Sequence, residues 1–140
     1  MRALVILNYT VNENISSGEV DVIEKLKDLY HLVFSVNNTN LYWTSLYSRN
    51  KTIVLEEAKD YKNDILHLLT DLGISNIDIV GYNTELEEVT DLALFLRANV
   101  ITKEESTKVT IWRNLTYNVN ETSLALCFKR GIDIRMYYNA

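Results

Sequence analysis

The stretch Leu72-Gly73-Ile74-Ser75-Asn76-Ile77-Asp78-Ile79-Val80-Gly81-Tyr82-Asn83-Thr84-Glu85 connects two helices through one short strand and is the most informative part of the sequence. Gly73 follows a periodic apolar segment, at the point where a left-handed residue commonly ends a helix. Ile77–Gly81 is mostly apolar and has the length of a buried strand. Thr84 and Glu87 have the spacing of a capping box, which predicts the start of a second helix.

Similar segments recur on both sides of this stretch, where apolar runs of strand length alternate with segments of helical periodicity. The predicted strands are 3–7, 32–36, 52–56, 77–81, 99–102 and 132–138, with 108–112 as a further candidate, and the predicted helices are 17–29, 59–72, 85–97 and 120–131. Strands that alternate with helices imply right-handed βαβ units and a parallel sheet. The sequence therefore predicts one α/β domain over residues 1–140. We expect a Rossmann-like three-layer αβα sandwich whose mainly parallel sheet has five or six strands.

The bulk properties narrow the function classes. The chain has 140 residues, a net charge of −5 and a pI near 5.0, which argues against general nucleic-acid binding and against binding to an anionic membrane. No apolar run reaches the roughly 20 residues of a membrane-spanning helix, and the first run is too short for a signal peptide. The single cysteine, Cys127, fits a reducing compartment. We expect a soluble, cytoplasmic protein, and abundant Asn, Ile, Tyr and Lys suggest an AT-rich source such as a virus or plasmid.

Ligands of open parallel sheets bind at the carboxyl ends of the strands, so the candidate site residues come from the segments that follow the predicted strands. These segments are 8–10, 36–43, 56–59, 81–88 and 102–105. The candidates for binding a small-molecule ligand are Asn8, Thr10, Trp43, Glu57, Tyr82, Asn83, Thr84 and Glu87. Trp43 belongs to an aromatic loop that suits a pocket, a contact between subunits or a local cluster that covers the edge of the sheet.

Four segments, taken in their order and spacing, resemble the isochorismatase-like cysteine hydrolases, the family that includes nicotinamidases. They are Ala3–Thr10, Ile53–Tyr61, Leu72–Glu88 and Asn120–Ile134, and the resemblance covers nearly the whole chain. The resemblance implies that Asn8 stands at the catalytic aspartate, with Thr10 at a following glutamine. It likewise implies that Glu57 stands at the catalytic lysine and Glu87 at the cysteine nucleophile.

The resemblance also implies that the hydrolase chemistry has been lost. An amide at Asn8 is no base at neutral pH, Glu57 reverses the charge of the lysine, and Glu87 has no sulfur. Cys127 is predicted on the inner face of the last helix, where a thiol acts as a small apolar group. We therefore expect a non-catalytic binding or assembly protein that needs no cofactor. Members of the family form dimers or larger assemblies, which implies a homo-oligomer.

Two further features of the family apply here only by position. Its metal-binding members use an acid and two histidines, whereas His31 and His67 are predicted at separate surface positions, so no metal site is expected. The family often has a cis peptide in the turn that forms its oxyanion hole, and Tyr82-Asn83 is the matching bond.

Two other functions remain open at this point. Glu57 and Glu87 would form an acid and base pair if they converged, or would provide oxygen ligands for Mg²⁺ in a metal-assisted hydrolase. The simpler interpretation of Glu87 is a solvated acid in the first turn of a helix. A nucleotide-binding regulatory domain also fits a Rossmann-like frame, although the sequence has no Gly-x-Gly-x-x-Gly motif and no P-loop.

Overall fold

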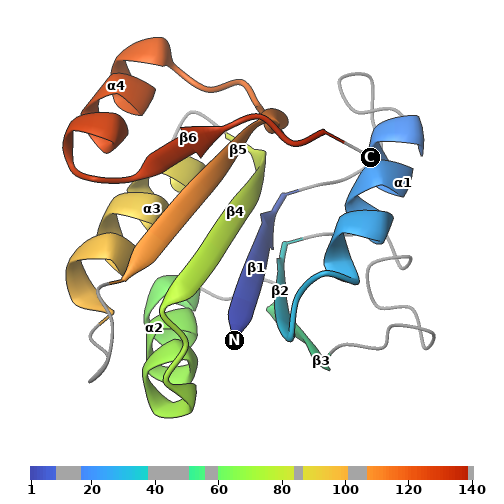
Figure 1. Cartoon of the computed structure of the whole chain (residues 1–140), viewed down its shortest axis with the longest axis vertical. Coiled ribbons are helices and arrows are strands. Elements are labelled where there is room, and N and C mark those ends of the chain that lie inside the picture. The colour runs from blue at the N-terminus through green and yellow to red at the C-terminus, as the bar shows by residue number, and fades with distance from the viewer. Residues whose placement is uncertain (9–16, 38–50, 56–59, 84–86, 101–106, 139–140) are drawn as a thin grey trace.

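The computed structural model describes residues 1–8, 17–37, 51–55, 60–83, 87–100 and 107–138 (Figure 1). The strands are β1 (Arg2–Leu7), β2 (Leu32–Val36), β3 (Lys51–Leu55), β4 (Asn76–Tyr82), β5 (Lys108–Tyr117) and β6 (Asp133–Arg135). The helices are α1 (Ser17–Lys27), α2 (Tyr61–Leu72), α3 (Glu88–Asn99) and α4 (Glu121–Lys129).

All six strands belong to one parallel sheet, which confirms the predicted fold class. The strand order is β3-β2-β1-β4-β5-β6, and every neighbouring pair is parallel. The chain runs outward from β1 to β3, returns through α2, and continues from β4 to β6. The direction of winding therefore reverses between β1 and β4, which are the two central strands.

The helices cover the two faces of the sheet unequally (Figure 1). Helices α2, α3 and α4 pack on the side that we call the first face, where side chains such as Leu69, Leu92 and Leu124 join Val5 and Ile79 in one apolar cluster. Helix α1 packs on the opposite side, the second face, where Ile23 and Leu26 contact Leu4 and Ile6. Among the described residues no other helix covers the second face, so a helix lies over β1 and β2 there but not over β4 to β6.

This coverage explains the composition of the strands. Residues 3–7 in β1 are apolar without interruption, because helices lie on both sides of that strand. In β4 and β5, polar and apolar residues alternate over 76–79 and 108–111, and the apolar ones face the first-face cluster. Side chains alternate between the faces of a sheet, so the polar ones lie on the second face.

Several predicted boundaries are wrong in an informative way. Helix α3 begins at Glu88, and Glu87 adopts a left-handed conformation with φ 53°, so the predicted capping box of Thr84 and Glu87 is wrong. The predicted strand 99–102 fails at Asn99, which ends α3, whereas residues 101–106 lie outside the described residues. The last strand comprises only Asp133–Arg135 instead of residues 132–138. In the portions of the chain that the structure describes, no helix is long and apolar enough to cross a membrane.

Candidate functional site

Asparagines end three of the strands in the same way. Asn8, Asn37 and Asn118 directly follow β1, β2 and β5, and their φ angles are 52°, 54° and 59°. Asparagine enters this left-handed region more easily than most residues, since its short polar side chain bonds locally. The backbone N–H of Asn8 donates to Val36 O, and that of Asn37 donates to Leu55 O. Asn8 and Asn37 therefore each extend the pairing of their strand by one backbone hydrogen bond.

Asn83, which follows β4, connects β4, β5 and α3 at the carboxyl ends of the strands. Its side chain is 1% exposed, and its Oδ1 accepts a hydrogen bond from the backbone N–H of Val89 in the first turn of α3, at 3.1 Å. Its backbone N–H donates to Tyr117 O at 2.8 Å, and its carbonyl accepts from Asn118 Nδ2, also at 2.8 Å. Asn83 thus does the capping work that the sequence assigned to Thr84.

The residues at the suspected catalytic positions are engaged in internal hydrogen bonds where the structure describes them. Asn8 Nδ2 donates to Tyr82 O at 3.2 Å, which joins the ends of β1 and β4. Glu87 Oε1 accepts from Ser123 Oγ at 2.8 Å, which joins α3 to α4. The peptide between Tyr82 and Asn83 is trans. The other candidates, Thr10, Trp43, Glu57 and Thr84, lie outside the described residues, so the convergence of Asn8, Glu57 and Glu87 stays a prediction.

Cys127 is a poor candidate for a nucleophile. Its side chain is fully buried in the first-face cluster, and its Sγ lies 3.9 Å from Thr90 O. Burial, and then the charges of Asp91 and Glu87, raise the pKa of Cys127 to about 11. The thiolate is the reactive form of cysteine, so burial and the raised pKa both disfavour its reaction at neutral pH. The predicted position of Cys127 on the inner face of the last helix is confirmed.

Alkylation measures this inertness directly. At pH 8 the raised pKa leaves roughly a hundredfold less thiolate than in an ordinary cysteine, and burial adds to the protection. We expect iodoacetamide to modify Cys127 in the native chain at least a hundredfold more slowly than it modifies glutathione, as followed by mass spectrometry. In concentrated urea the rate should return to that of glutathione. A native rate close to that of glutathione would show that the thiol is accessible and ionisable.

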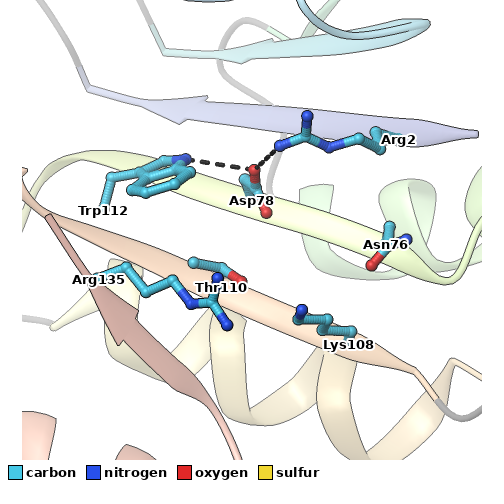
Figure 2. A pocket seen from close by; sticks show the side chains of 7 residues that line it. All are labelled: Arg2, Asn76, Asp78, Lys108, Thr110, Trp112 and Arg135. Carbon is cyan, nitrogen blue, oxygen red and sulfur yellow. Dashed lines mark hydrogen bonds and ion pairs between the residues drawn. The ribbon is translucent and has the colours of Figure 1, made fainter. Parts of the chain in front are cut away.

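A second candidate site lies on the second face, over the half that no described helix covers. It is a cavity of about 180 Å³ that we call the basic hollow (Figure 2). Its lining residues come from four neighbouring strands and are Arg2, Asn76, Asp78, Lys108, Thr110, Trp112 and Arg135. The first residues of β1, β4 and β5 are Arg2, Asn76 and Lys108. The hollow therefore lies at the amino ends of the strands, opposite the carboxyl ends where the asparagines lie.

Asp78 forms the floor of the basic hollow and is almost fully buried. Its Oδ2 accepts from Arg2 Nη2 at 2.9 Å, from Trp112 Nε1 at 3.2 Å and from the Tyr30 hydroxyl (Figure 2 shows the first two). The Arg2 guanidinium also lies 4.8 Å from the centre of the Tyr30 ring. Burial, and then the charge of Asp78, raise the pKa of Tyr30 well above its usual range, so the phenol stays a donor. The carboxylate of Asp78 thus pairs with one cation and accepts hydrogen bonds from two neutral donors.

The sequence contains a signal for this site in the alternation of two strands. The alternation Asn76-Ile77-Asp78-Ile79 in β4 recurs as Lys108-Val109-Thr110-Ile111 in β5, and such alternation is typical of strands that are covered on one face only. A three-layer sandwich covers both faces of its sheet, whereas these polar positions favour one uncovered face over β4 and β5.

The described residues contain no group of three or more side chains suited to hold a metal ion. His31 and His67 are both exposed, as predicted, and His31 Nδ1 accepts a hydrogen bond from the backbone of Arg2. The chain matches no protein-family model, and no curated protein or solved structure is significantly similar to it.

Proposed function

We propose that the chain is a non-catalytic relative of the isochorismatase-like cysteine hydrolases and acts as a binding or assembly protein. The observation that carries this proposal is the use of the amide side chains at the carboxyl ends of the strands. Asn8, Asn83 and Asn118 each bond to backbone groups of neighbouring elements. An amide is neither a base nor a nucleophile at neutral pH. These side chains therefore stabilise the carboxyl ends of the strands and transfer no proton.

Two other side chains support the proposal. Glu87, at the position that the resemblance assigns to the nucleophile, is held by Ser123 and bears no sulfur. The one thiol, Cys127, lies on the inner side of α4 and is buried in the first-face cluster. Thiol hydrolysis needs an accessible thiolate beside a base, and these residues provide neither. Self-association is part of the proposal, because the family that the chain resembles forms dimers or larger assemblies.

Hydrolysis assays and light scattering on one sample test the proposal. We expect no turnover of nicotinamide or isochorismate above the uncatalysed rate, with or without Mg²⁺ or Mn²⁺. We expect static light scattering to give the mass of a defined oligomer. A monomer that hydrolyses either substrate would contradict both parts of the proposal.

Two matched variants test whether any hydrolytic activity depends on Glu87. Glu87→Gln removes the charge at the suspected position and keeps an oxygen that can accept from Ser123. Glu121→Gln makes the same change at an exposed position on α4. Metal-dependent turnover that Glu87→Gln abolishes and Glu121→Gln retains would replace our proposal by acid-based or metal-assisted hydrolysis.

A further inference from the structure

The basic hollow concentrates positive charge on an acidic protein. Arg2, Lys108 and Arg135 reach it from three different strands, although the whole chain has a net charge of −5. Because Arg135 pairs with Trp112 in the register of β5 and β6, its side chain lies on the second face with those of Lys108 and Thr110. Figure 2 shows these side chains gathered around the hollow. The cationic character is therefore local and results from the strand register.

The carboxylates nearby do not saturate these cations. Arg2 forms an ion pair with Asp78. Lys108 and Arg135 both pair with the carboxylate of Asp133. Their nitrogens lie 3.8 and 3.5 Å from Asp133 Oδ2, which is long for a charged hydrogen bond. Among the residues that the structure describes, three cations thus face two carboxylates, which leaves the hollow one excess positive charge.

The lining also contains two neutral polar side chains, those of Thr110 and Asn76. Thr110 is 4% exposed, and it lies in the strand at the centre of the hollow. A hydroxyl that lines a hollow is satisfied there by water or by a ligand. The side-chain amide of Asn76 lines the other end of the hollow. These two groups are independent of the charges and point to a polar occupant.

The size and the lining select the class of ligand. The hollow, of about 180 Å³, has room for a compact polar group. A hard cation is excluded by the excess of positive charge, and an apolar molecule would leave Thr110 and Asn76 unsatisfied. A tetrahedral oxyanion accepts several hydrogen bonds at once from guanidinium, ammonium and hydroxyl donors.

We propose that the basic hollow binds a phosphate group, either as inorganic phosphate or as the head of a small phosphomonoester. Lys108 and Arg135 neutralise the charge from the open side, and Thr110 donates its hydroxyl from the floor. Asp78 acts indirectly, because its bonds to Arg2, Tyr30 and Trp112 fix the floor against which the ligand rests. This inference goes beyond the proposed function and does not depend on the resemblance to hydrolases, since none of its residues belongs to the suspected catalytic positions.

Tryptophan fluorescence and calorimetry test the inference. Trp112 lines the hollow, and Trp43→Phe makes it the only tryptophan of the chain, so its emission reports occupancy. We expect saturable binding of inorganic phosphate or glycerol 3-phosphate in the millimolar range or tighter, and none of glycerol. Sodium chloride at matched ionic strength controls for screening. Preference for glycerol 3-phosphate identifies a phosphomonoester as the ligand class, and preference for phosphate identifies the free ion.

Three variants locate the binding. The double variant Lys108→Gln/Arg135→Gln should weaken binding at least tenfold, and Thr110→Val should weaken it severalfold without a change of shape. Lys129→Gln, an exposed cation on α4 outside the hollow, should leave binding unchanged. The inference is overturned if neither anion binds saturably, or if Lys129→Gln weakens binding as much as the double variant does.

Discussion

Replacing Gly81 by alanine is expected to cost about 4 kcal/mol of unfolding free energy or more, or to prevent folding altogether. Gly81 has a φ of 147°, a conformation that alanine rarely adopts, and it pairs directly with Leu7 of β1. A Cβ at Gly81 would lie 2.2 Å from the carbonyl oxygen of Leu7 and 2.8 Å from its nitrogen. Backbone atoms of a central strand cannot move aside without breaking the pairing of β1 with β4. Urea denaturation followed by far-ultraviolet circular dichroism measures the loss.

Gly73→Ala is the matched control for this substitution. Gly73 also has a positive φ, 67°, but apart from its neighbours along the chain no described atom lies within 4 Å of the position that its Cβ would take. The expected loss is about 1 kcal/mol, the usual cost of placing alanine at a left-handed helix end. If the two variants lost the same stability, the close approach of β1 and β4 would not be the cause.

Asp78→Ala is expected to cost about 3 kcal/mol, the second largest effect. The substitution removes the acceptor that Tyr30, Trp112 and Arg2 share. The Tyr30 hydroxyl is the critical group, because Tyr30 is 2% exposed and a buried donor that loses its acceptor keeps the full cost of its desolvation. Trp112 loses less, since its Nε1 also lies 3.1 Å from the Tyr30 oxygen. Urea denaturation of the purified variant measures the loss.

Asp133→Ala controls for the removal of a carboxylate from the same face. Asp133 is more exposed than Asp78, and its ion pairs among the described residues are the two long ones with Lys108 and Arg135. Exposed pairs of this kind contribute little, so we expect a change within about 0.5 kcal/mol. Equal losses in the two variants would mean that charge, and not the buried network around Tyr30, explains the effect of Asp78.

The fold was predictable because the strongest sequence signals are those of burial. The unbroken apolar run of β1 and the regular spacing of helices indicated a parallel sheet, and the structure has six parallel strands. The left-handed Gly73 at the end of α2 is local and confirms the prediction. The cap of α4 by Asn120, whose Oδ1 accepts from Thr122 N, is equally local. Features that depend on a few neighbouring residues were thus within reach of the sequence.

The start of α3 was not predictable, because the residue that caps it is held from a distance. Thr84 and Glu87 have the right spacing for a local cap, but Asn83 is fixed by the backbone of Tyr117 and the side chain of Asn118. Once it is fixed there, its Oδ1 meets the first turn of the helix, and the local pattern is overridden. Nothing in residues 83–88 alone reveals this contact.

The basic hollow was missed for a related reason. Its polar residues were visible at alternating positions of β4 and β5, but the sequence does not state which face the helices leave uncovered. That outcome depends on the winding of the whole chain, which places α2, α3 and α4 together on the first face. The residues that line the hollow come from positions 2 to 135, so only the assembled sheet brings them into one cavity.

The central place of β1 has a consequence for the kinetics of folding. Its nearer partner, β2, follows after one helix, but its other partner, β4, is separated from it by 74 residues at the bond between Asn8 and Tyr82. Closing so long a loop is slow, because chain entropy is lost before the contacts form. A nascent chain therefore keeps one edge of its most apolar strand unpaired until β4 has been synthesised. During that interval the edge is open to chaperones and to association with other nascent chains.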